Sequence, residues 1–438
     1  MRKIFSVLLA ISVLSACISN VHAEELNIDA PSYILIDPET GRSLAEKEPD
    51  EKMYPASTTK IMTAIIALEQ GDLNQMATAS AKAIDLEYGS MHIGIMQGEQ
   101  IVLEDLLNAM MVRSANDAAN IIAENVGASY DDFIEQMNKK ARELGATNTH
   151  FVNPHGMHND DHYTTVRDMA TIARYAMSID KFREIVKKPY YDMKPTNKHE
   201  EWDRLYTINR FLTNLQEYKS DYFTPIGIKS GYTSQAGNTL VSAAVNDSGM
   251  ELIAVVFGAK GSNNNSDVYD FSKELLEYGF KNFSRKKLLK SNQLVESVNV
   301  EDATDNPSLD LVAESDISAI LPSDQDLSLL EKNIVLISPT ISAPVSKGDV
   351  LGYVEFRQDG VLLGKTNIVA SRSIDKSTKA IEKFSEEVAS ARPRLKNFLI
   401  GTATALVAFL LLRIILRRIS RARFSSRYST KSRKHYRN

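Results

Sequence analysis

Cysteine is almost absent from this 438-residue chain, which contains one, Cys17. A single cysteine cannot form an internal disulfide, so the chain has no disulfide framework. If Cys17 leaves with an N-terminal leader, thiol catalysis is excluded as well. The fold must therefore depend on a hydrophobic core, and any nucleophile must be another side chain.

Acidic residues are missing from both ends of the chain. Residues 1–23 and 397–438 contain no Asp or Glu, so all 56 acidic residues lie between them, where they outnumber Lys and Arg. The near-neutral total of −5 therefore hides an acidic body and a cationic C-terminal tail. An acidic body argues against nucleic acid as a partner.

The N-terminus has the pattern of a secretion signal. Arg2 and Lys3 precede an apolar stretch, Ile4–Ile18, and Val21–Ala23 offers a small-residue cleavage site. We therefore expect a signal peptide at 1–23. The alternative is a lipoprotein box ending at Cys17, which we rank second because a membrane anchor is also expected at the other end.

That anchor is Phe398–Leu416, nineteen residues with one charge, Arg413. The stretch is apolar on every side of a helical wheel, which predicts a transmembrane helix over 397–416. The tail at 417–438 holds nine Lys and Arg, so the positive-inside rule predicts a cytoplasmic C-terminus and an extracytoplasmic body in the cell membrane. Attraction to anionic membrane lipid then explains the basic tail better than nucleic-acid binding does.

The body is long enough for two domains, which we expect at 24–283 and 284–380, followed by a stalk at 381–396. In the first, strands flank a turn at 38–41, and a second hairpin is expected near its end. Strands at both ends with helices between them predict an α+β fold with an antiparallel sheet. Short strand patterns after 284 predict a small all-β domain. The expected strands are 32–37, 42–46, 239–245 and 251–257, and the expected helices are 58–70, 104–125, 130–144, 166–178 and 267–279.

Three short motifs stand in one order along the first domain: Ser57–Lys60, Ser114–Asn116 and Lys229–Gly231. The first pattern, Ser-x-x-Lys, also occurs at Ser284–Lys287 and Ser373–Lys376, so an isolated match carries little information. The informative features are the order of the motifs and the structural setting of each. Together they indicate serine acyl-transfer chemistry.

Ser57 is expected at the start of a helix, where the positive end of the helix dipole favours an alkoxide. Lys60 lies three residues on, on the same helical face, and can act as general base if burial or a second cation, such as Lys229, lowers its pKa. Ser114 could relay a proton to the leaving amine, and Asn116 could hold Lys60 and the substrate amide. The structural alternative is that Ser57 is only a helix cap and Lys60 a surface charge.

The third motif lies in an extended segment, 227–233. Lys229 and Ser230 could bind a terminal carboxylate, and Gly231 leaves room for a peptide to lie along the strand edge. The backbone N–H groups of Ser57 and Tyr232 would form an oxyanion hole.

Two other kinds of site deserve comparison. A zinc site could be suggested by three histidines, His155, His158 and His162, with Asp160 and Asp161 among them. Their spacing fits no standard metal motif, so we expect no metal and no cofactor. A Ser-His-Asp triad is possible in principle, but the sequence contains no Gly-x-Ser-x-Gly elbow.

Four segments carry a family resemblance: Tyr54–Ala64, Phe151–Gly156, Tyr163–Thr165 and Gly227–Thr233. They resemble the signatures of low-molecular-mass penicillin-binding proteins, the serine-type D-alanyl-D-alanine carboxypeptidases. The chain departs from the usual family pattern at Ala115, where relatives often have Gly or Asp, and at Ser230, where Thr is usual. Neither departure removes a hydroxyl or the amide from the motifs.

The resemblance implies a penicillin-recognising α/β sandwich with a helical cluster, followed by a β-sandwich domain. It also implies removal of D-alanine from the stem peptides of peptidoglycan and covalent inhibition by β-lactams. A β-lactamase or endopeptidase of the same fold, and a catalytically silent scaffold, remain alternatives.

Overall fold

The computed structural model describes residues 26–262, 265–304, 306–377 and 403–416. These residues form two units, the first comprising the chain to Leu288 together with Ile317–Glu331 and Phe356–Gly364. Four expected features lie outside the described residues: the signal peptide at 1–23, the stalk at 381–396, the first residues of the span at 397–402 and the basic tail at 417–438.

A five-stranded sheet in the order β2-β1-β9-β8-β7 forms the centre of the first unit. Its strands are β1 (Ser32–Ile36), β2 (Ser43–Lys47), β7 (Thr224–Thr233), β8 (Gly237–Val245) and β9 (Glu251–Ala259). All neighbouring pairs are antiparallel, and β1 pairs with β9 from the far end of the unit. The prediction of an antiparallel sheet built from distant segments is confirmed.

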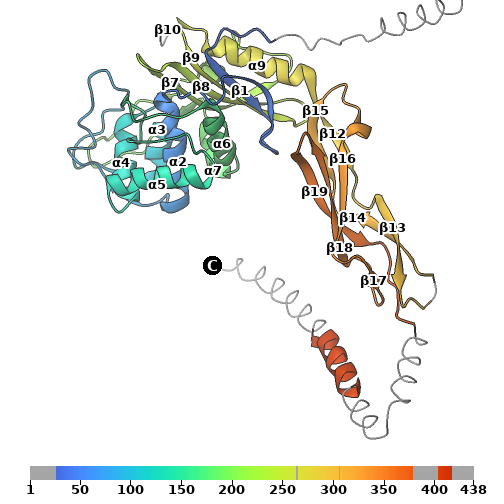
Figure 1. Ribbon diagram of the computed structural model, residues 1–438. Coiled ribbons are helices and arrows are strands. Elements are labelled where there is room, and N and C mark those ends of the chain that lie inside the picture. The colour runs from blue at the N-terminus through green and yellow to red at the C-terminus, as the bar shows by residue number, and fades with distance from the viewer. Residues whose placement is uncertain (1–25, 263–264, 305, 378–402, 417–438) are drawn as a thin grey trace, which may run out of the picture. The chain divides into compact units, whose positions relative to one another are not determined.

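Helices cover both faces of this sheet (Figure 1). Side chains of β9 alternate between two cores: Ile253, Val255 and Phe257 face the helical cluster, whereas Leu252 and Ala254 face α9. Both faces of the sheet are therefore covered, which explains why β8 and β9 are buried along almost their whole length. The helices are α2 (Lys60–Gln70), α3 (Leu103–Val112), α4 (Asn116–Val126), α5 (Tyr130–Glu143), α6 (Val166–Met177), α7 (Asp180–Val186), α8 (Arg210–Thr213) and α9 (Val268–Asn282).

The helix predictions are confirmed with one local difference. The second motif divides the stretch expected as a helix at 104–125 into two, because α3 ends at Val112 and α4 begins at Asn116. The first motif, however, begins with a 3₁₀ turn, Ala56–Thr59, and α2 starts only at Lys60. The hydroxyls of Thr58 and Thr59 donate to the carbonyls three residues earlier, at 2.7 and 2.8 Å, which tightens this turn.

Short strand pairs join the loops around this framework. They are β3 (Met76–Thr78) with β4 (Gln100–Val102), β5 (Tyr190–Tyr191) with β6 (Leu205–Tyr206), and β10 (Gly261–Ser262) with β11 (Asn265–Ser266). The β3–β4 pair closes the loop 79–99.

Among the described residues of 283–377, strands predominate, as predicted for the second domain. A six-stranded sheet has the order β16-β18-β19-β14-β13-β17, and β12 pairs separately with β15. Leu309, Leu311, Val354 and Ile368 are completely buried in it. The strands are β12 (Phe283–Leu289), β13 (Leu294–Glu301), β14 (Ser308–Ala313), β15 (Ile317–Pro322), β16 (Glu331–Leu336), β17 (Ile341–Ser342), β18 (Val350–Gln358) and β19 (Val361–Ala370).

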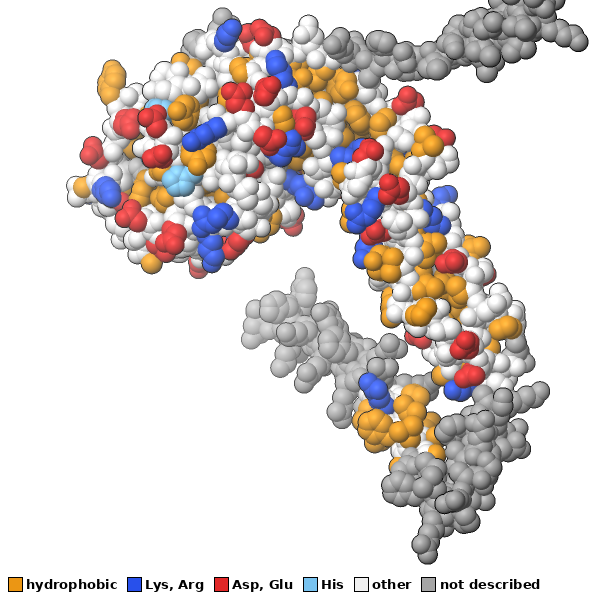
Figure 2. Space-filling model, viewed as in Figure 1, with side chains coloured by type: hydrophobic (Ala, Val, Ile, Leu, Met, Phe, Trp, Pro, Cys, Tyr) orange, Lys and Arg blue, Asp and Glu red, His pale blue; other side chains and the backbone are white. Residues whose placement is uncertain are grey.

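Residues 403–416 are helical, and apart from Arg413 their large side chains are exposed and apolar (Figure 2). Leu406 and Phe409, for example, are 63% and 61% exposed. In the part of the chain that the structure describes, no helix is both long enough and apolar enough to cross a membrane.

Candidate active site

Three residues from the first motif, the second motif and a distant loop meet at the amine of Lys60. Its Nζ lies 3.0 Å from the Ser57 hydroxyl oxygen, 2.7 Å from Asn116 Oδ1 and 2.7 Å from the backbone carbonyl of His155. Lys60 is fully buried at the start of α2. Folding therefore brings together two of the three predicted motifs around one amine.

The surroundings of Lys60 disfavour its positive charge. Burial lowers its pKa well below the ordinary value for lysine, and the nearby charge of Lys229 lowers it further, while Asp117 acts in the opposite direction. Lys229 is itself 1% exposed, and burial lowers its pKa to about 7. Two buried amines near one another thus favour at least one neutral amine in the neutral pH range.

The neutral form of Lys60 has a defined orientation. The oxygens of Asn116 and His155 can only accept hydrogen bonds, so they take the two N–H groups of a neutral amine. Its lone pair then remains for the third neighbour, the Ser57 hydroxyl. This arrangement can remove a proton from Ser57.

The second motif is a sharp connection between two helices. Ser114 is buried and has φ 64°, a left-handed conformation that is uncommon for residues other than glycine. Asn116 begins α4 and reaches Lys60, whereas the hydrogen bonds of the Lys60 amine do not include the Ser114 hydroxyl. The direct contact of the second motif with the buried amine is therefore made by Asn116 and not by Ser114.

The third motif lies on β7, the strand at one edge of the sheet. A Cβ at Gly231 would lie 2.6 Å from the backbone nitrogen of Ser57, so only glycine allows this strand to pass so close. Lys229 donates to the Ser230 carbonyl at 2.8 Å, and Tyr232 is 40% exposed. β7 thus brings the third motif against the first.

The loop that contains two of the family-resemblance segments, Phe151–Gly156 and Tyr163–Thr165, supplies the third contact of Lys60 through the carbonyl of His155. Gly156 has φ +88°, and a Cβ there would lie 1.8 Å from the carbonyl oxygen of Ala56. His162 Nδ1 accepts from the Val152 N–H, so Nε2 carries the proton and donates to Thr59 Oγ1 at 2.8 Å. Burial lowers the pKa of His162 to about 3, so this neutral form persists.

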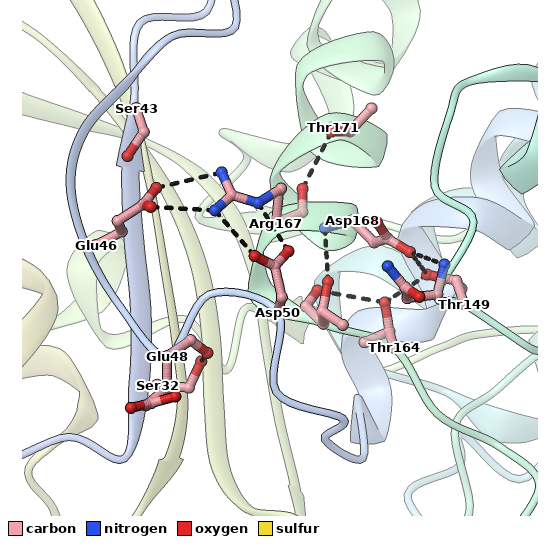
Figure 3. Close-up of polar contacts among 12 residues, drawn as sticks. Ser32, Ser43, Glu46, Glu48, Asp50, Thr149, Thr164, Arg167, Asp168 and Thr171 are labelled. Carbon is pink, nitrogen blue, oxygen red and sulfur yellow. Dashed lines mark hydrogen bonds and ion pairs between the residues drawn. The ribbon is translucent and has the colours of Figure 1, made fainter.

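The segment that leads to Ser57 is also anchored to helix α6 (Figure 3). Arg167 pairs with Asp50 at 2.8 Å and with Glu46 at 3.1 Å, and hydrogen bonding to Arg167 lowers the pKa of Asp50. The next residue of α6, Asp168, accepts a hydrogen bond from the Thr149 hydroxyl at 2.7 Å. The strand before Ser57 and the loop that contacts Lys60 are therefore held by neighbouring residues of one helix.

A cleft of about 490 Å³ opens beside the third motif. Two arginines line it: Arg113, directly before Ser114, and Arg210, on α8. Arg210 pairs with Glu217 at 2.7 Å and lies over the ring of Tyr269 at 5.5 Å. The other lining residues are Met91, Ile208, Asn214, Ser230, Gly231, Asn238, Thr239 and Val268. A pocket with two guanidinium groups and a strand edge suits an anionic peptide end.

The three histidines considered for zinc have other partners. His162 uses both ring nitrogens, His155 Nδ1 accepts from the Met157 N–H, and His158 lies 3.3 Å from Asp160. Across the described residues, no group of three or more His, Cys, Asp or Glu side chains is arranged to hold a metal ion.

Sequence reasoning did not identify the His155 carbonyl or either of the two arginines that line the cleft. The carbonyl of His155 leaves no side-chain signature, so no residue pattern could indicate its contact with Lys60. Arg210 is an ordinary arginine in a four-residue helix, and only tertiary packing brings it to the cleft.

Comparison with known proteins gives two adjoining family matches. A family model described as D-alanyl-D-alanine carboxypeptidase matches residues 19–261, and one described as the penicillin-binding protein 5 C-terminal domain matches residues 283–376. The D-alanyl-D-alanine carboxypeptidase DacF of Bacillus subtilis is 31% identical over 358 residues, which cover 81% of this chain and 88% of the relative.

Solved structures agree. Penicillin-binding protein 5 from Haemophilus influenzae is 29% identical, with a TM-score of 0.63, and covers 80% of this chain and 98% of its own. A peptidoglycan synthesis regulatory factor, PBP3, from Streptococcus pneumoniae shares the fold at 24% identity, with a TM-score of 0.66 over 80% of this chain and all of its own.

Burial of Lys229 predicts a pH-dependent cost in stability. Replacing a buried charge with an apolar side chain of similar size should raise the free energy of unfolding, so we expect Lys229→Met to stabilise the protein by about 1–4 kcal/mol at pH 6. The folded pKa of Lys229, about 7, lies below the unfolded value of about 10.4, so the folded wild type binds fewer protons between these values. Its stability therefore rises with pH, and the advantage of Lys229→Met should shrink from pH 7 to 10.

Urea unfolding of full-length protein at pH 6, 8 and 10 measures this difference. Lys187→Met, at an exposed position, is the control and should change stability by less than about 0.5 kcal/mol at every pH. An advantage of Lys229→Met that is equally large at pH 6 and pH 10 would contradict the interpretation.

Proposed function

The chain belongs to the D-alanyl-D-alanine carboxypeptidase family, and we propose that it removes the terminal D-alanine from peptidoglycan stem peptides through an acyl-enzyme on Ser57. The observation that carries this proposal is the contact between a buried, pKa-lowered Lys60 and the Ser57 hydroxyl.

In the acylation step, Ser57 Oγ attacks the carbonyl carbon between the two D-alanines while its proton passes to Lys60 Nζ. The carbon–nitrogen bond then breaks, and the nitrogen of the leaving D-alanine takes a proton from Lys60, with the Ser114 hydroxyl as relay. Water hydrolyses the ester and restores Ser57. Asn116 keeps Lys60 in place and contacts the amide of the substrate.

The peptide would bind as an added strand along β7. This strand is at the edge of the sheet, and Gly231 leaves its backbone accessible beside Ser57. The N–H groups of Ser57 and Tyr232 then face the carbonyl oxygen on which negative charge develops. Their closeness is supported by the 2.6 Å approach that a Cβ at Gly231 would make to the Ser57 nitrogen.

A β-lactam would follow the same first step. Its ring amide and carboxylate resemble the end of the stem peptide, and Ser57 would open the ring to form an ester. The name of the related Haemophilus protein supports this part of the proposal. A stable adduct fits a carboxypeptidase, rapid turnover a β-lactamase, and absence of labelling a silent scaffold.

We expect Ser57→Ala to abolish both the release of D-alanine from a D-Ala-D-Ala pentapeptide and covalent labelling by a fluorescent penicillin, because the variant lacks the hydroxyl that contacts the Lys60 amine. Ser284→Ala is the matched control, since Ser284 belongs to a second Ser-x-x-Lys pattern in β12. It should retain wild-type labelling. Undiminished D-alanine release by Ser57→Ala would refute the proposal.

The two cleft arginines should recognise the terminal carboxylate. A hydrogen bond to a charged group contributes about 1.5–3 kcal/mol, so we expect Arg113→Gln and Arg210→Gln each to raise KM for a free-carboxylate peptide by roughly 10-fold or more. The same variants should have little effect with the C-terminal amide of that peptide. Arg204→Gln, which removes an exposed pair with Asp192 outside the cleft, is the control. Equal effects on the acid and the amide would contradict this role.

We further propose that the C-terminal segment at 397–416 anchors the enzyme in the cell membrane, with the catalytic unit outside and residues 417–438 in the cytoplasm. The exposed apolar side chains at 403–416 support this, because a soluble surface rarely presents so many. The cationic tail adds attraction to anionic lipid.

Truncation after residue 396 tests the anchor. The full-length protein should remain in the membrane fraction after alkaline carbonate extraction, and the truncated protein should appear in the soluble fraction with its penicillin labelling intact. Release of the full-length chain by carbonate would contradict a spanning segment.

A further inference from the structure

Asp117 lies beside the site but takes no part in the chemical steps of the proposed mechanism. It follows Asn116 in the first turn of α4, and its side chain is almost completely buried, since the residue is 1% exposed. Its carboxylate accepts N–H groups from three successive residues of another segment, Ile93 at 3.1 Å, Gly94 at 3.1 Å and Ile95 at 3.2 Å. A fourth comes from Ala118 at 2.9 Å.

The segment held in this way, residues 89–98, is called the cleft loop below. It is bonded to α4 in the other direction as well, because the N–H of Asn116 donates to the Met91 carbonyl at 2.7 Å. Met91 is one of the residues that line the cleft. A hydrogen bond therefore joins the cleft loop directly to Asn116, the residue that contacts Lys60.

The other end of the cleft loop is held by a different buried carboxylate. Glu99 is completely buried and accepts from the Met96 N–H at 2.8 Å. It also binds His199 at 2.8 Å and the Thr196 hydroxyl, which belong to the segment between β5 and β6. Glu99 thus anchors the loop to the protein without touching the second motif.

We propose that Asp117 is a positioning residue that ties the cleft loop to the first turn of α4 and thereby keeps the Asn116 amide on the Lys60 amine. Four N–H groups converge on its two oxygens, which suits an ionised carboxylate at a helix N-terminus. Loss of the charge would leave buried N–H groups without a full set of acceptors, and the loop would separate from α4.

The negative charge of Asp117 also has an electrostatic effect that a purely structural residue would lack. It favours the protonated form of Lys60 and so raises the Lys60 pKa, against the lowering effects of burial and of Lys229. The other titratable groups nearby are His92, His155 and His162. Burial raises the pKa of Asp117, and the N–H groups that its carboxylate accepts act in the opposite direction, as does the charge of His92, which is exposed on the cleft loop. Burial lowers the pKa of each of the other two histidines to about 3.

The test compares full-length wild type with Asp117→Asn and with Glu99→Gln as the matched control. Amide hydrogen exchange of residues 91–96 measures the attachment of the loop, and the pH dependence of acylation by a fluorescent penicillin measures Lys60. We expect Asp117→Asn to speed exchange at Ile93, Gly94 and Ile95 by about 10-fold or more, because an amide supplies one acceptor oxygen instead of two. Acylation at its optimum should fall by about 10-fold, a loss that corresponds to about 1.4 kcal/mol.

The two variants should differ in their pH profiles. Without the charge of Asp117, Lys60 loses its proton more easily, so the rising acidic limb of acylation should move to lower pH in Asp117→Asn. Lys229 contributes to this limb equally in all three proteins. Glu99→Gln should speed exchange around Met96 but leave the limb where it is in wild type.

A third variant separates the effect of the Asp117 charge from a general loss of folded structure. Asp117→Glu keeps the charge but displaces the oxygens, so it should lose acylation rate while its acidic limb stays near that of wild type. Wild-type exchange and an unmoved limb in Asp117→Asn would overturn the inference. The kinetic measurement rests on the proposed function, so absence of labelling in wild type would contradict that function. Hydrogen exchange would still decide whether Asp117 holds the cleft loop.

Discussion

The buried amine of Lys60 is the constraint on which the rest of the site depends. A charged amine without solvent is costly, so the surroundings must either pair it or favour its neutral form. Here two carbonyl oxygens, from Asn116 and His155, and one hydroxyl, from Ser57, surround it. A second buried amine, Lys229, adds repulsion rather than pairing. The protein thus retains an arrangement that is unfavourable for stability and suited to removing a proton from serine.

Several backbone features hold this arrangement in place. Ala56 and Ser114 both have positive φ, and each lies directly before or within a motif. Such conformations persist only where the surroundings stabilise them. Around Ala56 this stabilisation comes from the loop at Gly156, from His162 through Thr59, and from β7 at Gly231. Around the second motif it comes from the buried carboxylate of Asp117. Rigid neighbours on several elements therefore maintain a locally strained centre.

Much of the fold followed from local patterns. Helices α5 and α6 begin and end within a residue of the predicted bounds because their apolar period is strong and Ser129 and Thr165 cap their N-termini. The short elements were not predicted, since two-residue strands such as β5 and β6 and the four-residue helix α8 have too few residues to show a period. The switch from α-helix to 3₁₀ turn at Ala56–Thr59 depends on hydroxyl–carbonyl bonds that the apolar pattern does not reveal.

The sequence by itself determined which side chains could perform acyl transfer, because Ser57, Lys60, Asn116 and Lys229 stand in motifs whose residue types match that chemistry. Tertiary structure alone decided the state of those groups. The pKa of Lys60 depends on burial and on Lys229, which is far away in the sequence, and the third partner of its amine is a backbone carbonyl that every residue possesses. Solvent exclusion and long-range proximity are properties of the folded chain, so no local pattern of residues can specify them.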